Sequence, residues 1–409
     1  MLNTIWIFFF ISAFITALFK LLYFGELEIF SQLMAALFAM SKTAFEISIG
    51  LTGVLALWLG IMRIGERSGF IDLLTRGLTP LFNKLMPEIP ANHPALGAMV
   101  MNISANALGL DNAATPLGIK AMQELQSLNP DKDTASNAQI LFLVINTSAV
   151  TLFPITIFTY RAQLGAAHPT DVFIPILLAT YMSTLCGLLA VAWAQKLNLW
   201  DKTILSYLGG FSLLVAGVIY YFSQLNQAEM LLQSALISNL ILFSLIILFI
   251  TRAAYKKVDA YQAFIEGAQE GFKTAIIIIP YLVAMLVAIG VFRASGALDL
   301  LMNALRMVIL QVNLDPRFID AMPTALMKPF SGSGARAMMV DTMQTFGPDS
   351  FAGRLSSIVQ GSTETTFYVL SVYFGAVGIK NIRHALACGI IADFAGIIAA
   401  IFIAYWFFA

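Results

Sequence analysis

The sequence predicts an all-α, polytopic membrane protein. Three observations support this fold class. Of 409 residues, 59% are hydrophobic, only 11% are charged, and apolar runs of helix length follow one another with little between them. Soluble domains average about 25% charged residues, so a soluble core does not account for the excess. The lipid bilayer is therefore the expected solvent for most of the chain.

Seven segments are apolar and long enough to cross a bilayer core, which takes about 20 helical residues. They lie near residues 3–24, 43–62, 172–197, 205–225, 229–252, 274–293 and 384–408. The first segment has neither a basic region before it nor a small-residue cleavage site after it, so we expect a retained helix rather than a signal peptide. The last segment ends in aromatic residues of the kind found at the headgroup level.

Four further segments are apolar at both ends but interrupted by small and polar residues: 97–125, 139–160, 318–346 and 355–377. The last two are interrupted at 331–334 and 360–364. Non-helical backbone is tolerated at membrane depth only where protein or a water-filled cavity receives it. We therefore expect 97–125 and 318–346 to form re-entrant hairpins, and 139–160 and 355–377 to form broken transmembrane helices.

The order of segments is repeated along the chain. Residues 63–74, RIGERSGFIDLL, resemble residues 293–301, RASGALDLL, and amphipathic stretches follow at 70–86 and 297–312. A repeat of span, amphipathic helix, interrupted pair and span indicates an internal duplication. With re-entrant hairpins the chain makes about nine crossings, and an odd number of crossings separates the two units, which predicts inverted repeats.

Basic residues near the helix ends predict the orientation. One side carries more of them, namely Lys196, Lys202, Arg252, Lys256, Lys257, Lys380 and Arg383. By the positive-inside rule this side is cytoplasmic, which places the N-terminus in the cytoplasm. The expected location is the cell inner (plasma) membrane.

Paired breaks at corresponding places in two inverted halves are typical of a central binding site in secondary transporters. A half-helix that begins after a break presents free N–H groups and a positive dipole end, which suit an anionic or hydrogen-bonding group. We therefore expect the substrate to be bound by residues at the breaks, namely Asn102, Ser104, Asn106, Asp111, Asn112, Asn146, Thr147, Ser148, Ser331, Ser333, Arg336, Gln360, Ser362, Thr363 and Glu364.

Two carboxylates are the candidate ligands of a coupling ion. Glu364 lies between the two arms of a broken span, where an ionisable residue is a candidate substrate ligand, ion ligand or proton carrier. Its alternative role is to satisfy the broken backbone without any transported partner. Asp393 lies in the last span, and its alternative is a packing role inside the helix bundle. Asp111 is also an ordinary N-cap residue.

Lys328 and Arg336 flank the tip of the second hairpin and favour a carboxylate or phosphate on the substrate. In the alternative, Lys328 extends toward the membrane surface, or Arg336 pairs with Asp341. The Asn, Ser and Thr side chains at the breaks of the first half also have an alternative role as hydrogen bonders between packed helices.

Several function classes are excluded by the sequence. Basic and acidic residues balance at 23 each, so no basic surface for nucleic acid is expected. The tip FSGSGAR lacks the Lys-Ser/Thr ending of a P-loop, and GSG is not a nucleophile elbow. The two cysteines stand alone in apolar segments, and the three histidines lie at loops or helix ends. We therefore expect no enzymatic activity, metal or cofactor.

Two long motifs resemble a known family. NISANALGLDNAATPLGIKAMQEL, residues 102–125, resembles spore maturation protein A, and KPFSGSGARAMM with VQGSTETTFYVLSVYFG resembles spore maturation protein B. The resemblance covers nearly the whole chain, as if both proteins were fused near 198–206. It implies an A-like half, residues 1–200, and a B-like half, residues 201–409, each with a nucleoside-recognition (Gate) domain.

The broader Gate group includes concentrative nucleoside transporters and the membrane part of ferrous iron transporters. That relation implies hairpins and broken helices around a central site, ion coupling, and a substrate role for Glu364 and residues 360–363. The chain shows no GTPase domain and no cysteine at a break, which argues against iron as a substrate.

The sequence thus predicts a secondary transporter or permease for a small polar solute, anionic or nucleoside-like, coupled to H⁺ or Na⁺. The partners are the solute, the cation and the bilayer, and the option of a homo-oligomer stays open. The alternative is a non-transporting envelope or spore-maturation scaffold. Polar residues that converge on one cavity would favour transport, and dry, apolar-filled breaks would favour the scaffold.

Overall fold

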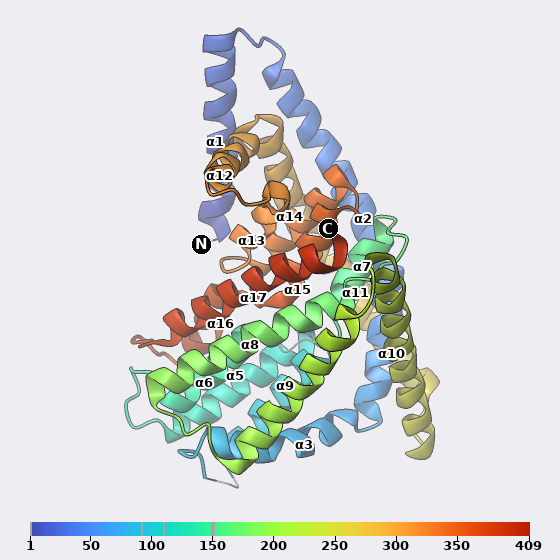
Figure 1. Ribbon diagram of the computed structural model, residues 1–409, viewed down its shortest axis with the longest axis vertical. Coiled ribbons are helices and arrows are strands. Elements are labelled where there is room, and N and C mark those ends of the chain that lie inside the picture. Colours follow the sequence, from blue (N-terminus) through green and yellow to red (C-terminus); the bar gives the residue numbers. More distant parts are fainter. Residues whose placement is uncertain (1, 91–92, 109–110, 149–151) are drawn as a thin grey trace.

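The structure consists almost entirely of helices. The computed structural model describes residues 2–90, 93–108, 111–148 and 152–409, without the side chains of residues 2 and 111–113. Within the described residues the backbone is almost wholly helical, with an isolated β-bridge between Thr134 and Asn381. Figure 1 shows how the long helices and the shorter, interrupted ones are arranged.

Seven helices in the described part are long and apolar enough to cross a membrane. They are α1 with its π-helical end (Leu2–Phe19 and Lys20–Phe24), α2 (Ile29–Arg67), α8 (Phe173–Gln195), α9 (Lys202–Ser223), α10 (Gln227–Tyr255), α11 (Ala260–Ala294) and α17 (Ala385–Phe408). Each coincides with one of the seven predicted spans. The prediction of a polytopic helical membrane protein is confirmed.

Helices α2 and α11 are longer than the predicted spans 43–62 and 274–293. They contain 39 and 35 residues. At about 1.5 Å per residue both exceed the roughly 30 Å of a hydrocarbon core. Each helix therefore either extends beyond the bilayer core or crosses it at a steep tilt.

The interrupted segments form pairs of short helices. In the first half these are α4 (Pro94–Ala107) with α5 (Asp111–Leu128), and α6 (Asn137–Thr147) with α7 (Ile155–Gln163). In the second half a 3₁₀ turn (Pro316–Ala321) leads into α13 (Met322–Met327), which pairs with α14 (Gly332–Phe346). The last pair is α15 (Phe351–Ser362) with α16 (Thr366–Gly375).

Two of the predicted interruptions are shifted. The second hairpin is non-helical before Gly332 rather than at 331–334, because the Ser331 hydroxyl accepts a hydrogen bond from the Gly334 N–H and caps α14. Helix α15 continues through Ser362, so the last break begins at Thr363 rather than Gln360. An N-cap fixes where a helix starts more sharply than residue polarity does.

The repeated motif forms the same turn in both halves. The amphipathic helices α3 (Phe70–Leu85) and α12 (Ala297–Gln311) follow Gly69 and Gly296, whose φ angles are +74° and +83°. Glycine adopts this left-handed region without strain. The preceding serines, Ser68 and Ser295, are both buried, and each donates a hydrogen bond to the carbonyl three residues back.

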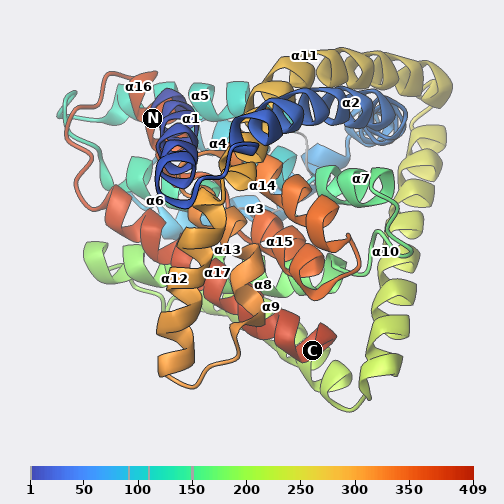
Figure 2. The ribbon, with the colours of Figure 1, turned by 90° about the horizontal axis from the view of Figure 1, so that it is seen from above.

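Corresponding helices of the two halves pack antiparallel. Along α2 and α11, Gly290 approaches Met40 while Gly267 approaches Leu59, and Figure 2 shows the two helices side by side. Along α8 and α17, Gln195 contacts His384 while Ser183 donates to the Ala392 carbonyl at 2.9 Å. An inverted duplication requires this antiparallel relation, although the inverted arrangement itself remains a prediction.

The two halves exchange their second half-helices. Val369, Leu370, Tyr373 and Phe374 of α16 belong to the same buried apolar cluster as α4, α5 and α6. Conversely, Ile155, Ile157, Phe158 and Tyr160 of α7 belong to the cluster that contains α13, α14 and α15. Helix α16 therefore packs with the hairpin and the first half-helix of the other half, whereas α7 shares its cluster with α2 of its own half as well as with α13, α14 and α15.

Candidate functional site

A cavity of about 720 Å³ lies where the interrupted segments meet. Its lining includes residues from both hairpins and both broken helices. The volume falls within the roughly 300–1,000 Å³ typical of small-molecule sites. The pockets at 450 and 410 Å³ involve loops and α12 instead, so we take the larger cavity as the candidate site.

Backbone hydrogen bonds join the breaks to one another. The Glu364 N–H donates to the Thr147 carbonyl at 2.7 Å, which links the last break directly to the end of α6. In the first half the Leu152 N–H donates to the Ala107 carbonyl at 2.9 Å, and in the second half the Phe367 N–H donates to the Pro329 carbonyl at 3.1 Å. Backbone N–H and C=O groups that would be costly at membrane depth without a partner are thus hydrogen-bonded within the protein.

One wall is a chain of amides from the first half that ends on a tyrosine of the second half. The Asn106 side chain donates to the Asn146 Oδ1 at 2.8 Å. The Tyr373 hydroxyl approaches the same oxygen at 3.4 Å and accepts from the Asn102 amide at 3.2 Å. Asn106, Asn146 and Tyr373 line the cavity, so this network sets the position of polar groups that a solute would meet.

The wall from the second half is cationic. Lys328, Ser331, Ser333 and Arg336 all line the cavity, and Lys328 is only 2% exposed. The alternative in which Lys328 reaches the membrane surface is therefore wrong. The alternative pairing of Arg336 with Asp341 is also wrong, because Asp341 forms an ion pair with Arg293 instead. Both carboxylate oxygens of Asp341 accept hydrogen bonds from the Arg293 guanidinium.

The two candidate carboxylates differ in setting. Glu364 lines the cavity, and among the described residues its carboxylate makes no hydrogen bond or ion pair. Asp393 is 1% exposed and lies behind the break, where it accepts hydrogen bonds from the Thr363 and Thr366 hydroxyls, both at 2.6 Å. Asp393 therefore braces the start of α16, while Glu364 faces the space a solute would occupy.

Eight of the predicted substrate-binding residues line the cavity: Asn106, Asn146, Ser331, Ser333, Arg336, Gln360, Thr363 and Glu364. Five others are buried behind its walls, namely Asn102, Ser104, Thr147, Ser148 and Ser362. Ser148 and Ser362, for example, donate to carbonyls within their own helices. The side chains of Asp111 and Asn112 lie outside the described residues, although α5 begins at Asp111.

Aromatic lining residues were missed from the sequence. Tyr281, Tyr368 and Tyr373 line the cavity, as do Phe330 and Phe367, whose rings stack at 5.2 Å. The sequence does contain a signal for them, namely a tyrosine in an otherwise apolar half-helix, such as Tyr373 in VLSVYFG. The hydroxyl of a buried tyrosine usually has a hydrogen-bond partner, so such a residue indicates a polar site nearby.

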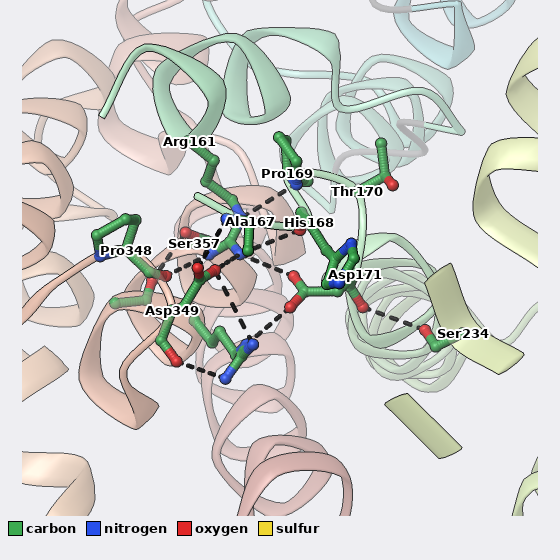
Figure 3. Close-up of polar contacts among 12 residues, drawn as sticks. Arg161, Ala167, His168, Pro169, Thr170, Asp171, Ser234, Pro348, Asp349 and Ser357 are labelled. Atoms are coloured by element: carbon green, nitrogen blue, oxygen red, sulfur yellow. Dashed lines mark hydrogen bonds and ion pairs between the residues drawn. The ribbon is translucent and has the colours of Figure 1, made fainter. Parts of the chain in front are cut away.

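The two halves also meet at opposite ends of α8 and α17. At one end, a set of buried ion pairs joins the loop after α7 (164–172) to the loop before α15 (347–350). We call this contact the buried closure. Arg161, fully buried, contacts Asp171 at 2.8 Å and Asp349 at 3.1 Å, and Arg354 contacts Asp171 at 2.8 Å. Figure 3 shows the Arg161 side chain between the two loops.

At the other end, a solvent-exposed contact joins the loop before α6 (129–136) to the loop after α16 (376–384). We call this contact the exposed closure. The Ala135 N–H donates to the Asn381 carbonyl at 2.9 Å, and the Lys380 ammonium pairs with Asp133 at 3.1 Å. The side chains of this ion pair are 78% and 65% exposed. A surface pair contributes little, so this closure depends mainly on its backbone hydrogen bonds.

Comparison with known proteins identifies the family. A family model described as Gate, nucleoside recognition, matches residues 48–164 and 275–380, together more than half of the chain.

The chain belongs to the Gate family.

The two matched segments run from α2 to α7 and from α11 to α16, so each contains a hairpin and a broken helix. Spore maturation protein B of Bacillus subtilis is 51% identical to this Gate protein over 148 residues, which cover 36% of the chain and 82% of the relative. Spore maturation protein A of the same organism is 47% identical over 148 residues, covering 36% of the chain and 76% of the relative. The predicted resemblance is confirmed, and the division at residue 200 remains a prediction.

Proposed function

We propose that this Gate-family protein is a secondary transporter or permease that moves a small polar solute, anionic or nucleoside-like, by alternating access. The observation that carries the proposal is the convergence of polar groups from both halves on one cavity at the breaks. A solute-binding role accounts for this convergence. A scaffold would not require it.

The two closures fit the same mechanism. Alternating access needs contacts that join the moving parts at each end of the site and open one end at a time. The buried closure and the exposed closure occupy corresponding loops of the two halves and lie at opposite ends of α8 and α17.

A coupling cation, H⁺ or Na⁺, would act at Glu364, with Asp393 as a second candidate. Glu364 faces the cavity, so a change in its charge would act directly on a bound solute. The same proposal includes the cell inner (plasma) membrane, with the N-terminus and the end that carries Lys380 in the cytoplasm.

The rival function is a non-transporting envelope scaffold. The observation in its favour is the printed name of the two relatives, which refers to spore maturation rather than to transport.

Uptake by proteoliposomes tests the proposal. Purified protein would be screened with labelled nucleosides, amino acids and dicarboxylates, under an inward H⁺ or Na⁺ gradient. We expect gradient-driven uptake of at least one class and its loss in Glu364→Gln. The control is Glu46→Gln, which removes an exposed carboxylate outside the cavity. Wild-type uptake by Glu364→Gln would remove Glu364 from the mechanism, and absence of uptake together with absence of ligand-dependent thermal stabilisation would favour the scaffold.

A further inference from the structure

We propose that the cavity binds the anionic group of its solute, a carboxylate or phosphate, at the first turn of α14 between Lys328 and Arg336. The anion would belong to a solute that also carries a hydrogen-bond donor. This inference rests on the proposed function, because it takes the cavity as the solute site.

The charges of the cavity wall support an anion. Among the described residues, the charged side chains in the lining are Lys328, Arg336 and Glu364, which leaves an excess of positive charge. Lys328 is 98% buried, since its exposed fraction is 2%. A carboxylate or phosphate in the cavity would add a strong charge-assisted hydrogen bond to this ammonium group.

The start of α14 supplies uncharged donors at the same place. The first N–H groups of a helix have no acceptor within the helix. The Ser331 hydroxyl satisfies the one on Gly334 at 3.0 Å, while Gly332 and Ser333, which carry two others, line the cavity. α14 has 15 residues, so its dipole also favours a negative group here.

Two unpartnered polar atoms face the same cavity from the neighbouring broken helix. The Gln360 Oε1 and the Thr365 Oγ1 are buried without a hydrogen-bond partner, in side chains that are 8% and 2% exposed. A buried polar group left unpaired costs about 1–3 kcal/mol, so a hydrogen bond from a solute to either group would be stabilising. The Thr365 hydroxyl can donate to an anion, whereas the Gln360 oxygen can only accept, which requires a donor on the solute.

The inference is tested with matched pairs of compounds that differ in the anionic group. The pairs are uridine with uridine 5′-monophosphate, and lactamide with lactate, and binding to the purified full-length protein is measured by calorimetry. We expect the charged member of at least one pair to bind about tenfold tighter or more than the neutral member. The pair that shows this preference distinguishes a phosphate from a carboxylate.

Substitutions then locate the anion. Arg336→Gln should weaken binding of the charged member far more than binding of the neutral member and so remove the preference, while Arg336→Lys should retain most of it. Lys42→Gln removes an exposed cation outside the cavity and is the matched control. The purified variants are compared by thermal unfolding, so that a folding defect in Arg336→Gln is separated from a binding defect.

Two outcomes overturn the anion site alone. In the first, uptake of a neutral solute is observed and charged and neutral members bind equally, so the proposed function stands and the anion site does not. In the second, Arg336→Gln weakens both members equally. Absence of uptake and of binding for every compound would instead contradict the proposed function, and the anion site with it.

Discussion

Arg161 joins the two halves through one side chain. Its guanidinium donates to the carbonyls of Pro169 and Pro348 as well as to two carboxylates, one from each half. Buried charges are stable only when they are paired and hydrogen-bonded, and here every partner lies in a loop. The side chain therefore links a loop of the first half to a loop of the second half.

Arg161→Met should destabilise the protein by about 3–5 kcal/mol, because it leaves Asp171 with one fewer partner in a buried site. The measurement is the midpoint of thermal unfolding of the purified protein. Arg306→Met is the matched control, since Arg306 pairs with Asp320 at the surface and is 40% exposed, so a loss of less than about 1 kcal/mol is expected. Equal losses in the two variants would contradict this account.

His384 makes stability depend on pH. Burial, together with the nearby Arg383 charge, lowers the pKa of His384 below its usual 6.5. The Gln195 amide donates to its neutral ring nitrogen at 3.1 Å, and protonation would remove that acceptor. The unfolded chain thus binds the proton more readily, so the stabilisation is present above about pH 6.5 and is lost as pH falls.

His384→Gln should therefore flatten the pH dependence of the unfolding midpoint between about pH 8 and 5. Wild-type protein should lose more stability over that range than the variant does. Identical slopes would show that His384 does not contribute.

At the scale of helices, close contact between α2 and α11 depends on glycines. A Cβ at Gly267 would overlap the Leu59 carbonyl oxygen, and one at Gly271 would lie 2.7 Å from the Ala56 backbone nitrogen. Small residues allow backbones to approach in membranes, where packing rather than the hydrophobic effect drives helix association.

Gly267→Ala should lower the unfolding midpoint by several degrees, because two long helices must move apart to accept one methyl group. Gly209→Ala, in the exposed stretch of α9 where no atom lies within 4 Å of the new Cβ, is the control and should be neutral or stabilising. A neutral result at Gly267 would indicate that the pair is more adaptable than its geometry suggests.

The spans and interruptions followed from the sequence because hydropathy reports directly on burial in lipid. The ends of α2 and α11 did not, since residues 29–42 and 260–273 mix polar and apolar side chains and their helical state depends on tertiary packing. Glu364 and Asn146 were predicted because polar residues inside apolar segments are rare. Tyr373 was not predicted, because its role depends on the packing of α16 against the other half. No local sequence pattern predicts that packing.

At the scale of the whole molecule, the unequal closures predict that the two ends open with different ease. The exposed closure depends on backbone bonds and a solvated ion pair, whereas the buried closure must desolvate or reorganise several charges to separate. Opening at the end that carries Lys380 should therefore be the easier step.

Cross-linking tests whether both closures open during transport. After replacement of Cys186 and Cys388 by alanine, cysteine pairs would be placed at 135 and 381, or at 167 and 349. We expect a cross-link at either pair to block proteoliposome uptake and a reductant to restore it. Uptake that continues with both ends cross-linked would contradict alternating opening at these loops.

The exchange of α7 and α16 has a consequence for biosynthesis. The core around α4, α5 and α6 is complete only when α16 arrives, more than 200 residues later in translation. We therefore expect the first half to stay incompletely packed until α16 has been made, and a chain divided between α8 and α9 to yield two polypeptides that depend on each other.

Residues 1–200 and 201–409 expressed separately should each be degraded, while co-expression should give a complex that co-purifies through a tag on either piece. Two pieces that are each stable alone would mean that the exchanged helices are dispensable. Otherwise the chain is best regarded as a permanently tethered pair, in which the connection between α8 and α9 guarantees that each half meets its partner.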